Sequence, residues 1–457
     1  MSRTAVASRT TFVDLVSPGG HLVDPIVWML LVVGFLLGPL KMLTGSWLSY
    51  VVPDGLAGLA LLVVVLERIV TRKPLFARSA ITVPLVFLAV YCLLEFFNPE
   101  APVIRSLLGL RSWLLYTAFY FVGLYTFRDA RQLQRLYIVL LVLGLITGLY
   151  GVYQWRVGPQ AFASWSGYYG RYAQLTWLAK SGGVFRAFST FILPNTFGAN
   201  MALLMMIVFG VISSSDTAYR WRMAAAAAFL VMAVGIVASG SRGPVAHLLI
   251  AAVALLAIVR GASSKLRLAA TAMLVSSAAV VLIALVIGPV VTQRYSTIFD
   301  PQAFFWKWFG PLTEGVRLAS EHPFGMGLGY TAGVPQFVAD PFFRNLPSEN
   351  VDSGYGSAAA ELGLLGMLLF AYLAIKVAVE GLRAWKTLPP GRLKDLFIGP
   401  LLMAVTYPIL SVVSQPQATL PSSIYFWLLI GMLVRASTLY GEGYATRVLG
   451  SEMHSRE

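Results

Sequence analysis

The residues best suited to chemistry lie between about Gln293 and Gly366, a long polar segment in the second half of an otherwise apolar chain. Cations in this segment could neutralise a phosphate group, and its carboxylates or its histidine could accept a proton from a hydroxyl. The cations are Arg294, Lys307, Arg317 and Arg344, and the carboxylates are Glu314, Glu321, Asp340, Glu349 and Asp352. We therefore expect a catalytic site to draw on this segment.

His322 opens a glycine-rich turn inside the polar segment, with glycines at 325, 327 and 329. This spacing is similar to a dinucleotide fingerprint, but no strand precedes it and the segment is not expected to reach the cytoplasm, which argues against a Rossmann site. We expect the glycines to let the backbone pack closely at the membrane surface.

A second candidate site is the turn Ser239-Gly240-Ser241-Arg242-Gly243-Pro244 between two apolar helices. Backbone N–H groups in such a turn, together with the start of the next helix, can bind an anion. Arg242 adds a bidentate donor suited to phosphate. The alternative is a tight interhelical turn whose arginine only reaches for the membrane interface.

Arg186 and Asn195 close a loop rich in aromatic residues, which are Trp165, Tyr168, Tyr169, Tyr172 and Trp177. These aromatics would form an interfacial belt or a surface for stacking sugar rings. Asn195 follows a proline at the start of a helix, where a capping role would explain it without any function.

Two further charged residues lie in apolar helices. Arg111 is several residues inside a helix, where a charge is costly, so it should face an anion or a carboxylate such as Glu95. Glu361 lies one to two turns into the helix after the polar segment and could pair with an arginine or support catalysis.

The elements that must position these residues are membrane helices. Hydrophobic residues make up 58% of the 457 residues, 12% are charged, and the mean hydropathy is +0.74, which predicts an all-α polytopic membrane protein. Because Cys92 is the sole cysteine, an intrachain disulfide is excluded, and the four histidines are too scattered to match the ligand spacing of a zinc site. The net charge of +14 resides mostly in short interhelical loops, which argues against nucleic-acid binding.

A helix needs about 20 apolar residues to cross a bilayer. Runs that meet this length predict about twelve spans, at 25–43, 51–70, 80–97, 105–127, 133–157, 196–214, 222–240, 244–260, 267–289, 355–383, 396–414 and 420–440. The first run lacks a convincing cleavage site, so we interpret it as a retained helix rather than a signal peptide.

Lysine and arginine concentrate in alternate loops, at about 68–78, 128–135, 220–222, 260–267 and 383–394. Since basic loops stay in the cytoplasm, both termini are predicted to be cytoplasmic. The chain then divides into a tail (1–24), helices one to nine (25–289, with an outer loop at 158–195), a large outer loop (290–354), helices ten to twelve (355–440) and a C-terminal tail (441–457).

Three motifs together resemble the bacterial O-antigen ligase and polymerase family of membrane glycosyltransferases. They are Arg186-Ala187-Phe188-x-Thr190-Phe191 with Pro194-Asn195, Ser239-Gly240-Ser241-Arg242-Gly243, and His322-Pro323-Phe324-Gly325-Met326-Gly327-Leu328-Gly329 leading to Glu361-Leu362-Gly363-Leu364-Leu365-Gly366. The resemblance covers roughly residues 185–370, and the remainder is similar in topology only.

The resemblance implies a GT-C-like fold in the bacterial inner membrane and inverting, metal-independent transfer of a glycan without a cofactor. The donor would be an undecaprenyl-diphosphate-linked oligosaccharide, the acceptor would be a growing glycan or the lipid A core, and the transfer would take place on the periplasmic side. Partners would include membrane lipids and, for a polymerase, a flippase and a chain-length regulator. Basic side chains, chiefly arginines, would hold the diphosphate. The candidates are Arg242 and, with it, Arg186, Arg294, Arg317, Lys307 or Arg111. Ser239, Ser241, Asn195 and Glu361 would support them.

The family's catalytic histidine has no counterpart at the expected spacing. Counting back from Gly363 places Asp352 at that position, followed by Ser353. Asp352 would then be the base, with Glu349 and His322 as alternatives, or this branch would use another mechanism. A different interpretation makes Asp352 the cap of the next helix, reinforced by Ser353.

Three other functions compete with a glycan polymerase or ligase. A peptidoglycan glycosyltransferase of the shape, elongation, division and sporulation family uses an aspartate, but the three motifs fit it poorly. A polysaccharide or ion transporter should place charges near the bilayer midplane, whereas these charges gather at the outer face. A scaffold that only binds the lipid-linked glycan would keep Arg242 and need no base.

Overall fold

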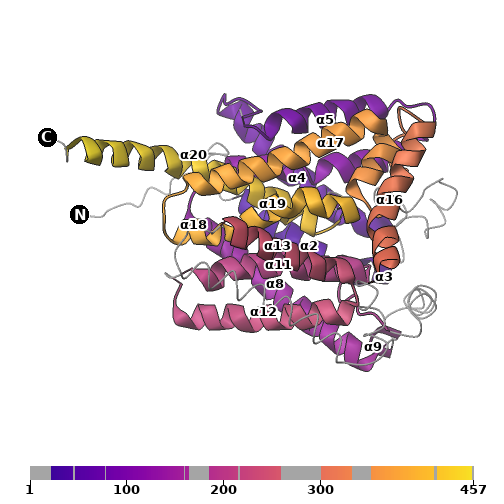
Figure 1. Cartoon of the computed structure of the whole chain (residues 1–457), viewed down its shortest axis with the longest axis horizontal. Coiled ribbons are helices and arrows are strands. Elements are labelled where there is room, and N and C mark those ends of the chain that lie inside the picture. The colour runs from indigo at the N-terminus through magenta and orange to yellow at the C-terminus, as the bar shows by residue number, and fades with distance from the viewer. Residues whose placement is uncertain are drawn as a thin grey trace, which may run out of the picture.

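The described part of the chain is a bundle of long helices that run side by side (Figure 1). This computed structural model describes residues 22–44, 47–77, 79–158, 160–163, 185–214, 217–258, 300–331, 351–415 and 419–454. Within these ranges there are helices and connecting turns but no strand. The predicted all-α class is therefore confirmed.

Most of the described long helices overlap predicted apolar runs. In the first half of the chain they are α2 (Val23–Phe35), α3 (Leu37–Thr44), η1 (Trp47–Tyr50), α4 (Val51–Val70), α5 (Thr82–Glu95), α6 (Val103–Leu110), η2 (Arg111–Leu115), α7 (Phe119–Thr126), α8 (Ala130–Val157), α9 (Gln160–Ala163) and α11 (Pro194–Ser213). In the second half they are α12 (Tyr219–Ser239), α13 (Arg242–Ile258), α16 (Pro301–Glu321), α17 (Gly354–Thr387), α18 (Arg392–Leu396), α19 (Ile398–Val413) and α20 (Ser422–His454).

Seven segments of the described chain are long and apolar enough to cross a membrane, and the bent pair α2 and α3 would make an eighth. The seven are Val103–Thr126, Ala130–Val157, Pro194–Ser213, Tyr219–Ser239, Gly354–Thr387, Arg392–Val413 and Ser422–Gly441. The chain is thus a multi-pass membrane protein. The predicted total of about twelve stays a prediction, since the run at 267–289 lies outside the described residues and α5 and α13 are short.

Three of the helices predicted as continuous are broken. The run at 25–43 bends by 64° between α2 and α3. The run at 105–127 contains a π-helical turn, η2, between α6 and α7. Helix α17 is interrupted at Gly363, which has φ 67° and ψ −173°. A hydropathy window averages across such breaks, and π-turns and glycines in this conformation are common where a helix must admit another group.

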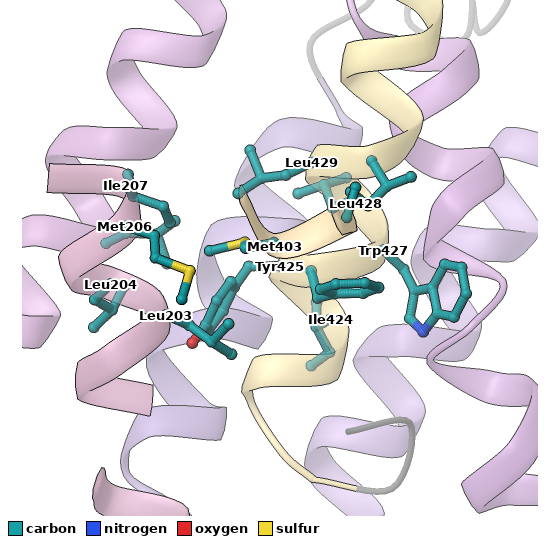
Figure 2. Packing of buried hydrophobic residues seen from close by; sticks show 14 of the residues in the cluster. Leu203, Leu204, Met206, Ile207, Met403, Ile424, Tyr425, Trp427, Leu428 and Leu429 are labelled. Atoms are coloured by element: carbon teal, nitrogen blue, oxygen red, sulfur yellow. The ribbon is translucent and has the colours of Figure 1, made fainter. Parts of the chain in front are cut away.

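The core lies where α11, α19 and α20 meet (Figure 2). Apolar side chains from the three helices fill the space between them, among them Leu203, Met206, Met403, Ile424 and Leu428. One polar contact crosses this core, because the Tyr425 hydroxyl donates to Asn200 Oδ1 at 3.0 Å. In a bilayer, where lipid is as apolar as leucine, such packing and hydrogen bonding replace the hydrophobic effect in holding helices together.

Small residues let α7 and α20 approach each other at backbone distance. A Cβ added to Gly123 of α7 would lie 2.0 Å from the Leu428 carbonyl oxygen, and one added to Gly431 of α20 would lie 2.1 Å from the Tyr120 carbonyl oxygen. Two glycines on facing helices thus serve the same purpose, as is usual at close helix crossings in membranes.

The bundle has two ends with different contacts. At one end, which carries α18 on the left of Figure 1, Arg128 pairs with Asp24 at 3.1 Å and its carbonyl accepts from the Tyr440 hydroxyl at 3.1 Å. The opposite end carries α3, α9 and α16. Arg128 belongs to a basic loop predicted to be cytoplasmic, so the end with α16 is the one expected to face outward. This orientation remains a prediction.

The large loop predicted at 290–354 is not all loop. It contains the 21-residue helix α16, which includes the aromatic run from Phe304 to Phe309. Figure 1 shows α16 at the right-hand end of the bundle, where it runs across the direction of the long helices. This helix was not predicted, because its mixed composition and Pro311 are typical of a polar connection.

Candidate functional site

Four residues from two predicted motifs meet in a cluster that we call the arginine turn: Arg186, Asn195, Ser239 and Ser241. The Arg186 Nε donates to the Ser239 carbonyl at 2.9 Å, and its Nη2 donates to Asn195 Oδ1 at 2.6 Å and to Ser241 Oγ at 2.8 Å. Ser241 Oγ also donates to Asn195 Oδ1 at 3.1 Å. Arg186 is 7% exposed, so its guanidinium organises the turn from within.

Local backbone geometry explains why these segments meet. Helix α12 ends at Gly240, which adopts the left-handed conformation with φ 57°. A Cβ on Gly240 would lie 3.3 Å from Cγ of Arg186, so a side chain there would crowd the arginine. The Ala187 N–H donates to the Ala238 carbonyl at 3.0 Å, which fixes the loop against the end of α12.

Asn195 does not cap a helix, contrary to one predicted role. Helix α11 begins at Pro194, is flanked by Leu193, and has no side-chain cap. The amide of Asn195 instead accepts from Arg186 and Ser241, while the residue as a whole stays exposed. Asn195 therefore extends the arginine turn to the protein surface.

Arg242 is the first residue of α13 and follows the arginine turn directly. It is partly exposed, whereas Arg186 is buried. The first N–H groups of a helix lack partners within the helix and favour a negative charge. A guanidinium and a helix start thus lie together beside a turn that Arg186 holds rigid.

Asp352 lies just before α17 and is exposed. The helix cap is Ser353, whose hydroxyl accepts from the Gly356 N–H at 3.0 Å, so the interpretation of Asp352 as the cap is wrong. Serine satisfies an otherwise unpaired N–H at this position. The side chain of Asp352 is therefore not needed to cap α17.

The backbone beside Asp352 is held by side chains of the bundle. The Gln415 amide donates to the Val351 carbonyl and, at 2.5 Å, to Ser357 Oγ. Ser357 Oγ donates to the same Val351 carbonyl at 3.1 Å. An exposed carboxylate therefore stands on a fixed backbone, as a base requires.

Helix directions place Asp352 and Arg242 at the same end of the bundle. The start of α11 contacts the turn before α13, since a Cβ on Gly198 would lie 2.7 Å from Ser239 Oγ. Near its other end α11 contacts the start of α19, since a Cβ on Gly399 would lie 2.7 Å from Cα of Ile207. Helices α13 and α19 therefore run in opposite directions, joined by a His247–Thr406 hydrogen bond of 2.7 Å.

It follows that the end of α19 lies level with the start of α13. That end of α19 also contacts the start of α17, because Ser353 Oγ reaches the Ser411 carbonyl at 3.4 Å. Two predicted site residues from distant parts of the sequence, Arg242 and Asp352, thus flank the same end of α19.

Glu361 anchors a second cluster, which we call the carboxylate lock: Glu361, Trp113, Gly329 and Thr331. The carboxylate accepts from Trp113 Nε1 at 2.8 Å, from the Gly329 N–H at 2.9 Å, and from the N–H and hydroxyl of Thr331 at 2.7 Å each. Glu361 is fully buried. Charge-assisted hydrogen bonds of this kind are strong, and here they tie the glycine-rich turn to two helices.

The glycine-rich turn fills the break in α17. The Met326 N–H donates to the Ala360 carbonyl at 2.7 Å, which supplies a partner that the broken helix cannot. Gly325, Gly327 and Gly329 have φ of 82°, 80° and 79°, and a Cβ on Gly329 would lie 2.2 Å from the Arg105 carbonyl. The expected close backbone packing is present, and only glycine fits this geometry.

Arg105 was not predicted as a site residue, yet it holds the same turn. Its Nη2 donates to the Met326 carbonyl at 2.5 Å and to the Glu100 carbonyl at 3.3 Å, and its guanidinium lies 5.5 Å from the ring centroid of Tyr330. The available signal was an arginine in an apolar run, the same signal that drew attention to Arg111.

His322 lies in a separate cleft rather than in the arginine turn. Its Nδ1 is 3.4 Å from Glu100 Oε2, and the side chain is 36% exposed. The cleft is also lined by Glu95, Asn98 and Glu321. A histidine beside a carboxylate in a cleft could accept a proton, so His322 stays a candidate base. Within the described residues no three His, Cys, Asp or Glu side chains gather in a way that could hold a metal ion.

Arg111 pairs with Asp54 rather than with Glu95, which corrects one prediction. Its Nε is 2.5 Å from Asp54 Oδ2, and its Nη2 donates to the Tyr116 hydroxyl at 2.7 Å. Glu95 instead accepts from Asn98 Nδ2 at 3.0 Å. Arg111 also lines a small cavity with Thr196, next to Asn195, so it lies near the arginine turn while its charge is largely compensated.

The other predicted cations are less favourably placed or lie outside the described residues. Arg317 lies on an exposed face of α16, where it contacts Glu314 and Glu321 at 2.6 Å each. The hydrogen bond from Arg317 lowers the pKa of the Glu314 carboxyl. Arg294 and Glu349 lie outside the described residues, and of Lys307 only the backbone, on α16, is described.

The comparisons with known proteins bear on this end of the bundle. Residues 227–371 match a family model described as O-antigen ligase. The matched region spans the turn with Arg242, helix α16, the glycine-rich turn, Asp352 and Glu361. No curated protein matches the chain.

Proposed function

Because residues 227–371 match a family model described as O-antigen ligase, we propose that the chain belongs to the O-antigen ligase and polymerase family and is an inverting glycosyltransferase. The family supports an activity of the ligase or polymerase type in general. The proposal adds the donor, an oligosaccharide on undecaprenyl diphosphate, and the acceptor, a hydroxyl of a second saccharide. The reaction would take place on the periplasmic side of the inner membrane, without a metal ion or a cofactor.

The observation that carries the proposal is the arrangement around the end of α19. On one side of this end lie the arginine turn and the partly exposed Arg242 at the start of α13. On the other side lies the exposed Asp352, on a backbone held by Gln415 and Ser353. Positive charge and a carboxylate base at one end of the bundle are what transfer from a diphosphate donor needs.

The donor diphosphate would bind at Arg242. Its guanidinium can donate two parallel hydrogen bonds to phosphate oxygens, and the first N–H groups of α13 add to the attraction. Arg186 would act differently, since its described hydrogen bonds all go to protein oxygens. We assign Arg186, Asn195, Ser239 and Ser241 the task of fixing the turn that presents Arg242.

The acceptor hydroxyl would lose its proton to Asp352. The hydroxyl oxygen attacks the anomeric carbon while the bond from that carbon to the diphosphate oxygen breaks. The proton passes to the carboxylate, and the electron pair leaves with undecaprenyl diphosphate, whose charge Arg242 stabilises. A single displacement of this kind inverts the anomeric configuration.

His322 is a second candidate for the base, because it lies beside Glu100 in a cleft. The two candidates predict different variants. With Asp352 as the base, Asp352→Asn removes transfer and His322→Gln retains most of it. With His322 as the base, the two results are reversed.

A direct test is transfer by the purified protein in liposomes that contain its lipid-linked oligosaccharide. A ladder of products on a gel indicates a polymerase, and a single shift of an added acceptor indicates a ligase. Absence of any product with the natural donor and acceptor pair, while donor still binds, would favour a transporter or a binding scaffold instead.

A further inference from the structure

Helix α16 carries an exposed apolar stripe along one flank. Phe305, Phe309, Leu312 and Val316 follow a spacing of four, three and four residues, which places them in one row on a helix. Phe305 is 52% exposed, Phe309 and Val316 are 38% exposed each, and Leu312 is partly exposed. Trp306, at 68% exposure, lies at the edge of this row.

The other exposed flank of α16 is charged. Glu314, Arg317 and Glu321 are spaced by three and four residues, and their side chains are 40%, 50% and 53% exposed. Arg317 contacts both carboxylates at 2.6 Å. The exposed surface of α16 therefore divides lengthwise into an apolar and a charged half.

The third face of α16 is packed against the bundle. A Cβ on Gly315 would lie 2.2 Å from the Gly356 carbonyl oxygen at the start of α17, and Leu318 and Ala319 are buried. The helix runs across the direction of the membrane spans (Figure 1), as a helix lying in the plane of a membrane does. Its rotation about its own axis is fixed by this packing.

The helix that α16 packs against, α17, carries exposed apolar residues of its own. Three residues after α16 comes Phe324, which is 76% exposed and touches the break of α17 at Gly363. Beyond the break, Leu364, Leu365 and Leu368 are exposed on α17, a helix long and apolar enough to cross the bilayer. An exposed apolar row on such a span is a lipid contact.

We propose that α16 is an interfacial membrane helix: its Phe305–Phe309–Leu312–Val316 stripe inserts into the boundary between headgroups and acyl chains of the outer leaflet. The charged stripe then faces water. Aromatic residues are favoured at this depth, and a helix with one apolar and one charged flank binds there through its buried apolar area. The occupant of the stripe is phospholipid, because α16 packs on α17, a membrane span whose exposed leucines contact lipid.

Single-cysteine labelling tests this proposal in the whole protein. Cys92 is the sole cysteine in the sequence and is buried, so Cys92→Ala provides a background for new cysteines. Phe305→Cys, Phe309→Cys and Val316→Cys report on the apolar stripe, and Glu314→Cys, Arg317→Cys and Glu321→Cys are the matched controls on the charged stripe. Each variant carries an environment-sensitive fluorophore and is placed in phosphatidylcholine liposomes.

A quencher attached near the top of a phospholipid acyl chain should quench the apolar-stripe probes at least about twofold more than the controls, because the stripe lies at that depth. A water-soluble quencher should show the opposite order. Equal quenching of both stripes by the water-soluble agent would overturn the proposal. Shielding of the apolar-stripe probes from both quenchers would also overturn it, because a protein would then cover the stripe.

Discussion

The arginine turn and the carboxylate lock each contain one buried charged residue, and the hydrogen-bond partners of the two residues lie in different surroundings. In the arginine turn, Arg186 donates to a carbonyl and to two side chains, one of which, Asn195, remains exposed. In the carboxylate lock, Glu361 is completely buried and accepts four hydrogen bonds from residues of two other segments. The hydrogen-bond network of Arg186 reaches the protein surface at Asn195, whereas the carboxylate of Glu361 lies inside the protein.

This difference predicts different roles for the two clusters. A buried carboxylate whose partners are all protein donors contributes a fixed connection between segments, and its loss leaves those donors without acceptors. A cluster that reaches the surface can influence a bound anion without contributing as much to stability. Variants in the two clusters should therefore affect stability and transfer to different extents.

The largest effect on stability should come from Glu361→Ala. The change leaves the buried N–H groups of Trp113, Gly329 and Thr331 without an acceptor, at a cost of about 3–5 kcal/mol in the free energy of unfolding. Thermal unfolding in detergent measures this cost. Glu380→Ala is the control on the same helix, since its described ion pair with Arg383 is long, at 3.9 Å. Equal melting temperatures for the two variants would show that the carboxylate lock does not hold the fold.

Gly329→Ala should come next, at about 2–4 kcal/mol, because it combines a strained φ with overpacking. The new Cβ would meet the Arg105 carbonyl at 2.2 Å. Gly243→Ala, where a Cβ meets nothing within 4 Å, is the control and should unfold like the parent protein. The same detergent measurement applies, and a Gly329→Ala protein as stable as Gly243→Ala would contradict the proposed packing of the turn.

Ser241→Ala should lower the free energy of unfolding by about 1–2 kcal/mol, since it removes one hydrogen bond to a charged group, but it should reduce transfer more than tenfold.

Asn195→Asp tests whether the arginine turn influences the bound donor. It keeps an acceptor for Arg186 and so keeps stability, while its added negative charge should weaken binding of a diphosphate donor. Unchanged donor affinity in Asn195→Asp would indicate that the arginine turn is structural only.

Arg317→Ala should have the smallest effect on both stability and transfer. Its two ion pairs lie on an exposed face of α16, where such pairs contribute little. Transfer assays and thermal unfolding should both match the parent protein. A marked loss of transfer at unchanged stability would move Arg317 into the diphosphate site and weaken the assignment to Arg242.

Hydropathy and motif order predicted the class, most helix positions and the residues that gather at one end. They could not predict the breaks in α2–α3, in α6–α7 and at Gly363, because a broken helix keeps the average composition of a continuous one. They also could not assign partners: Asp54 was not linked to Arg111, and Arg105 was not linked to the glycine-rich turn. Such pairs are set by helix packing between positions 57 and 221 residues apart.

Two predictions were made for Asp352. Its role as the base, which rests on counting from Gly363, stays a prediction, and its role as a helix cap is wrong, because Ser353 is the cap. Asn195 lies in a sequence pattern typical of a helix cap, but its side chain instead accepts a hydrogen bond from Arg186. Residues with short polar side chains near helix starts need the backbone geometry before a role can be assigned.

The most direct test of the central claim is donor-dependent transfer by Arg242→Ala and Asp352→Asn in proteoliposomes, with Arg317→Ala as the control for the charge that Arg242→Ala removes. Each variant is first matched to the parent protein in thermal unfolding. We expect Arg242→Ala and Asp352→Asn each to reduce transfer by at least about 100-fold, the range expected for loss of charge stabilisation or of a base. Near-full transfer by both variants, at unchanged stability, would contradict the proposed site.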